Sequence, residues 1–194
     1  IILVPKAENG FAGLEVAKVL PEYVLKLADL FWTYAPKQEG SSYHSSIEVE
    51  QYFGLEETHF YYFPRSAFQT PIYWLLQYSL KETVDFILEF TNKSVRHYAN
   101  SGFDSSVKKV NLFFDDGTTK EQYISHCLWN MYRGTSSPVS PYLLQCIHMA
   151  LEKYFLEQGK LVDSEILESW LIYLLKHSES ASISAVVTLS LIHI

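Results

Sequence analysis

The sequence lacks the features on which several large protein classes depend. It has two cysteines, Cys127 and Cys146, in no paired motif, which argues against a disulfide framework and favours a reducing cytoplasm. Neither GxxxxGK[ST] nor GxGxxG occurs, so the common phosphate-binding loops are absent. The longest uncharged run near the centre, residues 66–80, is too short to span a bilayer. No signal peptide is visible.

Charge is also scarce. Charged residues make up 19% of the 194 residues, and the formal net charge is −7. This balance argues against a nucleic-acid surface or an anionic membrane as partner. Hydrophobic residues make up 48% of the chain and aromatic residues 15%, which is enough for a packed core. We therefore expect a soluble, cytoplasmic protein.

Both ends of the chain suggest a piece of a larger protein. The sequence opens on IILVPK without a methionine, and its last six residues read LSLIHI. That hexapeptide is the translation of the mosaic-end adapter used in transposase-based sequencing libraries. We expect residues 189–194 to be foreign to the protein, with a natural apolar tail as the alternative.

What the chain does contain is helical periodicity. The pattern predicts a mainly α fold, an irregular helical array or α-solenoid-like helix pairs, with one small β-hairpin. Residues 1–63 are expected to hold N-terminal helices and a long irregular connection. Residues 64–135 would form a central helical core with a hairpin near 107–125. Residues 136–188 would form an αα-hairpin and the start of a third helix.

The N-terminal third predicts two short helices, the second restarting at Pro21. The spacing of that helix predicts an apolar face made of Tyr23, Leu27, Leu30 and Phe31. Further on, a single long helix is expected between Pro71 and Gly102, with opposite-charge pairs Lys81/Asp85 and Glu89/Lys93 one turn apart.

The C-terminal helices carry the clearest boundaries. Residues 142–158 have Leu144, Ile147, Leu151 and Tyr154 at helical spacing and stop at Gly159. Asp163 is expected to cap the next helix, residues 164–177. A third helix is expected from about residue 182.

An apolar run followed by two acids, residues 110–116 (VNLFFDD), resembles a Walker B segment. In that interpretation Asp115 would hold Mg²⁺ and Asp116 would polarise water. The alternative is a hairpin in which Asp116 and Gly117 supply the tight turn. The hairpin is favoured, because no phosphate-binding loop accompanies the acids.

Histidine and carboxylate side chains gather in the irregular stretch before the centre. They are His44, Glu48, Glu50, Glu56, Glu57 and His59. Such groups can hold zinc or iron, which would suit a metal-dependent hydrolase or nuclease. Their spacing matches no helical ligand pair such as HExxH, so a solvated acidic loop is favoured.

Other reactive or recognition residues have plainer interpretations. Cys127 follows His126, and Cys146 precedes His148 by two positions, spacings that do not face each other on a helix. Both thiols are expected to be structural. Arg133 could dock an acidic partner, but capping a helix end is favoured. The aromatic residues, fourteen tyrosines and Trp32, Trp74, Trp129 and Trp170, could mark a recognition surface. Most of them lie at helical spacing, so a place in the core is favoured.

Three segments of the sequence together carry a resemblance to a known family: PIYWLLQYSLKETVDFILEFTNKSV, LWNMYRGTSSPVSPYLLQCIHMALEKYFLE and LESWLIYLLKHSESASISAVVT. They resemble an internal region of very large bacterial ATP-binding proteins of the STAND-like kind, linked to antiphage defence. The resemblance covers residues 10–188. It implies a helical region flanking a P-loop ATPase that binds ATP and Mg²⁺ elsewhere in the parent chain.

The leading hypothesis is therefore a non-catalytic scaffold or sensor segment of a larger protein. No catalytic, cofactor-binding or metal-binding residue is assigned within these 194 residues. The expected partners are the flanking domains of the same chain, with a protein ligand or self-association as further options. The alternatives are the metal-dependent hydrolase or nuclease and a free-standing interaction module.

Overall fold

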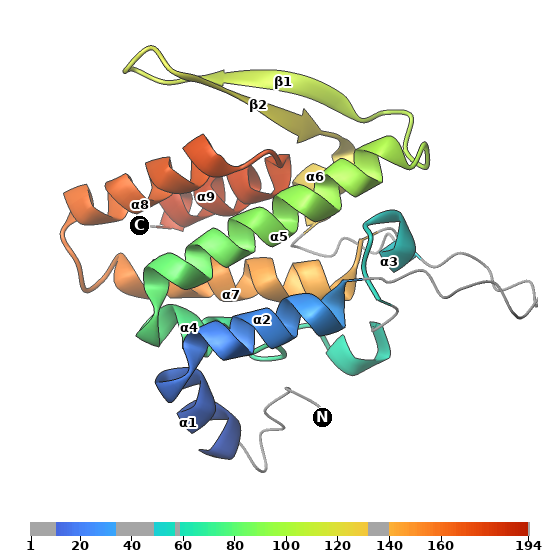
Figure 1. The fold of residues 1–194 in the computed structure, drawn as a ribbon. Coiled ribbons are helices and arrows are strands. Elements are labelled where there is room, and N and C mark those ends of the chain that lie inside the picture. The colour runs from blue at the N-terminus through green and yellow to red at the C-terminus, as the bar shows by residue number, and fades with distance from the viewer. Residues whose placement is uncertain (1–10, 34–48, 57–58, 132–139, 194) are drawn as a thin grey trace, which may run out of the picture.

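The computed structural model describes residues 11–33, 49–56, 59–131 and 140–193 (Figure 1). In these ranges the chain is mainly helical, with one two-stranded antiparallel sheet, so the predicted fold class is confirmed. The first elements are α1 (Phe11–Val19), α2 (Pro21–Trp32), α3 (Val49–Tyr52), the 3-10 helix η1 (His59–Tyr62), α4 (Ile72–Tyr78) and α5 (Leu80–Asn100). The others are β1 (Lys108–Phe113), β2 (Thr119–Ile124), α6 (His126–Asn130), α7 (Tyr142–Gln158), α8 (Ser164–His177) and α9 (Ala181–His193).

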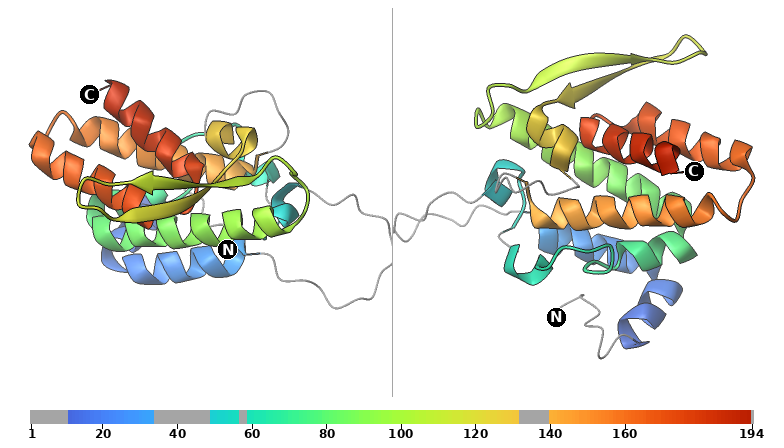
Figure 2. Two further views of the ribbon diagram at one scale, coloured as in Figure 1. Left: turned by 90° about the horizontal axis from the view of Figure 1, so that it is seen from above. Right: turned by 180° about the vertical axis from the view of Figure 1, so that it is seen from behind.

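Helix α7 is the centre of the molecule. Its buried residues are Leu143, Leu144, Gln145, Cys146, Ile147, His148, Ala150, Leu151, Tyr154 and Phe155, so the helix is enclosed on nearly all sides. It packs against α4 and η1 and against α9 (Figure 2). Because α4 and α7, like α6 and α9, are neighbours in space but not in sequence, the fold is the irregular helical array. A solenoid would place each helix pair only against the next.

The segment expected as a single helix between Pro71 and Gly102 forms two. α4 ends and α5 begins at Ser79, whose backbone angles (φ −147°, ψ 66°) are not helical. The Ser79 hydroxyl donates to the Glu82 carboxylate at 2.7 Å. Serine followed three residues later by glutamate is a signature of a helix start. The single-helix prediction was wrong because it followed hydrophobic spacing and overlooked this signature.

Helix α2 buries a different side from the predicted one. Its buried residues are Val24, Leu25, Ala28 and Trp32. The residues predicted to face the core are Tyr23, Leu27, Leu30 and Phe31, and they are between 39% and 70% exposed. Both sides of the helix carry apolar residues, so spacing alone could not decide which side meets the core. The buried Trp32 indole packs edge-on against the Phe90 ring of α5, with centroids 5.8 Å apart.

Charged contacts on α5 differ in part from the expectation. Lys81 and Asp85 form the predicted pair at 2.5 Å. Lys93, expected to meet Glu89, lies 3.7 Å from Asp29 of α2. These side chains are about half exposed, so each pair contributes little to stability.

The β-hairpin lies where the sequence placed it, across the α8–α9 end of the molecule (Figure 1). Gly117 has φ +79°, the conformation that the tight turn requires. The Asp116 carboxylate accepts hydrogen bonds from the backbone N–H of Thr118 at 3.0 Å and from its hydroxyl at 2.6 Å. The turn interpretation of the two acids is therefore confirmed.

A buried polar network, not predicted from the sequence, fixes the hairpin to the helices. The Gln122 side chain of β2 donates to the Ser178 carbonyl at 3.2 Å and accepts from the Ser184 hydroxyl at 2.7 Å. The Asn92 side chain of α5 accepts from the Glu179 N–H at 2.7 Å. These bonds satisfy main-chain groups at the α8–α9 junction that would otherwise be buried without partners.

The C-terminal helices have the predicted boundaries. α7 ends before Gly159, and α8 begins after Asp163, although the Asp163 side chain makes no capping bond. α8 packs mainly against α9, β2 and α5. α9 continues to His193 and so includes most of residues 189–194. None of the helices in the described ranges combines the length and the apolarity needed to cross a membrane.

Candidate interaction surface

The predicted histidine and carboxylate cluster is only partly described. His44, Glu48 and Glu57 lie outside the described residues. Glu50, in α3, is only 2% exposed, so it does not belong to a solvated loop as expected. Glu56 donates its backbone N–H to the Trp32 carbonyl at 3.0 Å, and His59 begins η1. Within the described ranges, no three His, Cys, Asp or Glu side chains are grouped to hold a metal ion.

The two acids of the supposed Walker B segment lie in and beside the hairpin turn. Besides its bonds to Thr118, the Asp116 carboxylate accepts a hydrogen bond from the Lys176 ammonium of α8. The Lys176 and Thr118 bonds hold the pKa of Asp116 well below its usual range. Asp116 thus serves the turn and ties the hairpin to α8.

The two thiols have the properties of structural cysteines. Cys146 is buried, and this burial raises its pKa to about 11. Burial also raises the pKa of the half-buried Cys127, whose sulfur lies 3.7 Å from the Ser140 hydroxyl. A raised pKa keeps a thiol protonated at neutral pH and therefore a weak nucleophile. His148, on the same helix as Cys146, has its Nε2 3.4 Å from the Thr91 hydroxyl of α5.

The aromatic residues divide between core and surface. Trp32 is 5% exposed, as predicted. Trp74 and Trp170 are partly buried against the core, and Trp129 is 42% exposed. Arg133, the proposed docking or capping arginine, lies outside the described residues.

An exposed apolar surface lies on the first two helices and is not buried in the core. It is here named the α1–α2 face. It comprises Val16, Val19, Leu20, Tyr23, Leu27, Leu30 and Phe31, each at least 39% exposed. These positions recur every three or four residues. The backbone angles of Leu20 (φ −134°, ψ 53°) are not helical, so α1 and α2 change direction at this residue and each contributes its own part of the exposed surface.

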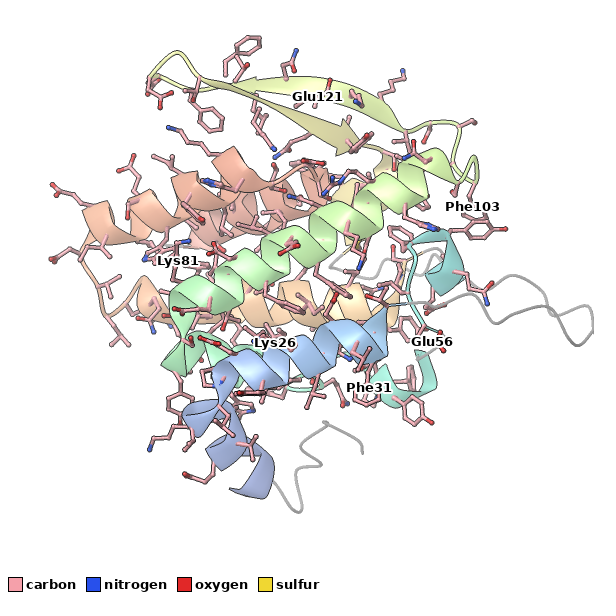
Figure 3. All side chains as sticks on the ribbon, in the orientation of Figure 1. Lys26, Phe31, Glu56, Lys81, Phe103 and Glu121 are labelled. Carbon is pink, nitrogen blue, oxygen red and sulfur yellow. The ribbon has the colours of Figure 1, made fainter. Side chains whose placement is uncertain are left out.

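The exposed area of these residues is large. From the fractional exposures, its side chains present on the order of 700 Å², close to the ~800 Å² that each partner buries in a standard interface. Single exposed apolar residues are ordinary, whereas larger exposed apolar areas are common at interaction sites. Phe31 lies on the edge of α2 away from α5, and Lys26 lies on the edge toward it (Figure 3).

A comparison with protein-family models finds no match for this chain, and a comparison with curated proteins finds none either.

Proposed function

We propose that this chain is a non-catalytic helical scaffold or sensor segment of a larger cytoplasmic ATP-binding protein of the STAND-like kind. In this proposal the α1–α2 face packs against a flanking domain of the same protein. The resemblance of the three sequence strings suggests the parent, and the exposed apolar face suggests the contact. ATP and Mg²⁺ bind in the parent, outside this segment.

The α1–α2 face is the observation that carries the proposal. Apolar area removed from water contributes about 25 cal/mol per Å², so covering such a face is strongly favourable before the costs of association are counted. A separate partner loses translational and rotational freedom when it binds. A flanking domain in the same chain has already lost most of this translational and rotational freedom, because the linker holds the two surfaces at a high effective concentration.

The test compares this chain with the longer protein encoded in the same reading frame. Leu30→Cys, in a background of Cys127→Ser and Cys146→Ala, reports on the α1–α2 face through its rate of labelling by a maleimide. Ile166→Cys is the matched control, because Ile166 is 51% exposed on α8. We expect labelling at position 30 to slow at least about tenfold in the longer protein, while labelling at position 166 is unchanged.

Two results would overturn the proposal. One is a reading frame without a P-loop ATPase on either side of this segment. The other is equal labelling at position 30 in the short and long proteins, since a covered face cannot react as fast as an open one.

A further inference from the structure

A second surface of α2 faces α5 and differs in chemistry from the α1–α2 face. The two helices enclose a groove of about 480 Å³, here named the α2–α5 groove. Trp32 of α2 packs against two of the α5 residues that line it, with ring centroids 5.8 Å from Phe90 and 6.2 Å from Phe86. Lys26, on the edge of α2 nearer α5, is part of its rim (Figure 3).

The floor of the groove is apolar. It is formed by Leu25 of α2 and by Phe86 and Phe90 of α5, and the two phenylalanine rings stack with centroids 5.6 Å apart. Leu25 and Phe90 are buried, whereas Phe86 is only partly buried. Phe86 is therefore the floor residue that can meet a ligand's aliphatic side chains, or a guanidinium group stacked on its ring.

The rim is acidic. Five carboxylates line it, against the two ammonium groups of Lys26 and Lys93 in the lining and that of Lys81, which pairs with Asp85 at 2.5 Å. The carboxylates are Glu22, Asp29, Glu82, Asp85 and Glu89. Their existing ion pairs are open to water: Glu22 and Lys26 are 3.9 Å apart with about 70% of each side chain exposed. A ligand's cations can reach such carboxylates without breaking a buried pair.

Hydrogen bonds further favour the ionised form of two of these carboxylates. The Ser79 hydroxyl lowers the pKa of Glu82. The bonds from Lys81 and Tyr173 outweigh partial burial and lower the pKa of Asp85. The excess of negative charge repels nucleotides, nucleic acids and anionic lipids, and attracts cations.

We infer that the α2–α5 groove binds a basic amphipathic peptide segment from a partner protein. The α5 side of the groove runs from Glu82 to Lys93, about 16 Å at 1.5 Å per residue, which matches three turns of a bound helix. Apolar side chains of the segment cover Phe86 and its neighbours. Lysine or arginine side chains one turn apart meet the carboxylates on both rims, as in other helix-in-groove complexes.

This inference is independent of the proposed function, because it uses the other side of α2. The α1–α2 face contributes none of the groove's lining residues. A flanking domain could cover that face while the groove stays open, so either idea can fail alone.

The experiment measures binding of a fluorescent synthetic peptide to the 194-residue chain by anisotropy. The probe is a helix of leucine and lysine about twelve residues long, with leucine on one face. Two matched peptides replace its lysines by glutamate or its leucines by glutamine. We expect the leucine–lysine peptide to bind at least about tenfold more tightly than either, and its binding to weaken as salt rises.

Charge reversal locates the site. The double variant Glu22→Lys/Glu89→Lys changes one carboxylate on each rim, and we expect it to weaken binding at least about tenfold. Glu165→Lys/Glu168→Lys on α8 is the matched control, because Glu22 and Glu165 both lie in a first helical turn and all four side chains are exposed. Amide chemical-shift changes from the peptide should fall on α2 and α5.

Each contrary result overturns the inference. Equal weakening by the two double variants would mean attraction to net charge without a site. Equal binding of the glutamine–lysine peptide would mean that the apolar floor is not used. Absence of binding by the unaltered chain, or shift changes centred on α8, would exclude the groove directly.

Discussion

Replacing His148 with leucine should remove an acid-dependent loss of stability. His148 lies in α7 and is fully buried. Burial alone lowers the pKa of its imidazole from 6.5 to about 3. Its Nε2 lies 3.4 Å from the Thr91 hydroxyl, and its Nδ1 has no hydrogen-bond partner in the described part of the chain. The folded protein therefore holds this histidine neutral throughout the mildly acidic range.

The sign and size of the effect follow from the two pKa values. Below pH 6.5 the unfolded chain takes up a proton at His148, whereas the folded chain does so only near pH 3. Stability is thus retained above pH 6.5 and falls as the pH drops, by about 1.4 kcal/mol for each unit. Between pH 7 and pH 5 the loss is about 2 kcal/mol, a large part of the roughly 5–15 kcal/mol of a typical domain.

The assay is urea unfolding at several pH values from 7 to 5. Glu157 and Asp104, whose pKa values are lowered by their hydrogen bonds, contribute stability that is lost below their unfolded values near pH 4. The chosen window therefore separates them from His148. We expect the wild-type chain to lose about 2 kcal/mol across it and His148→Leu to lose less than half as much.

At pH 7 the leucine variant should be less stable than the wild type by about 1–3 kcal/mol, because the volume is similar but the buried Thr91 hydroxyl loses its contact with Nε2; the test is therefore the slope with pH and not the stability at pH 7. His126→Gln is the control, since His126 is exposed, and it should leave the wild-type slope unchanged. Parallel pH profiles for His148→Leu and the wild type would refute the reasoning.

Three further predictions concern other parts of the fold. Asn92→Ala should lower the free energy of unfolding by about 2–3 kcal/mol. The substitution leaves two main-chain groups without their partner, the Glu179 N–H at 2.7 Å and the His177 carbonyl at 2.9 Å. An effect below about 0.5 kcal/mol in urea unfolding would contradict a stabilising role for this network. Gly117→Ala should lower the free energy of unfolding by about 1 kcal/mol. An added Cβ would meet no other atom, so the cost comes from the backbone angle φ of +79° alone. Calorimetry should show a lower Tm, and an unchanged Tm would mean that the turn relaxes. Leu30→Glu should leave the unfolding free energy within about 0.5 kcal/mol of wild type, because Leu30 is 70% exposed, and should weaken binding of an apolar dye. A strongly destabilised variant would show instead that Leu30 is part of the core.

The elements predicted well are those that neighbouring residues define. The start of α2 at Pro21, the end of α7 before Gly159 and the hairpin turn at Asp116 and Gly117 all lie where the sequence placed them. Each depends on the backbone preferences of one or two residues, which a sequence states directly. The helix break at Ser79 is also indicated by nearby residues, since Glu82 follows the serine by three positions. The prediction missed this break because the apolar pattern continues through it.

The candidate surfaces were not predicted. Neither the α1–α2 face nor the α2–α5 groove was recognised, because α2 carries apolar residues on more than one side and only the packing of Trp32 against α5 decides which side is buried. The histidine and carboxylate stretch, which had attracted a metal hypothesis, contains a buried Glu50 that no spacing rule indicates.

The sequence by itself determined that the chain is mainly helical, the ends of α7 and α8 and the hairpin turn, because capping, turn geometry and periodicity act between residues close in the chain. Only the tertiary structure decided that α7 is enclosed on nearly all sides, that His148 is buried and neutral, and that Asn92 and Gln122 bond the α8–α9 junction. Those outcomes depend on contacts between segments that are 50 or more residues apart. The energy of a buried polar group is set by what surrounds it in space, and a local pattern does not contain that information.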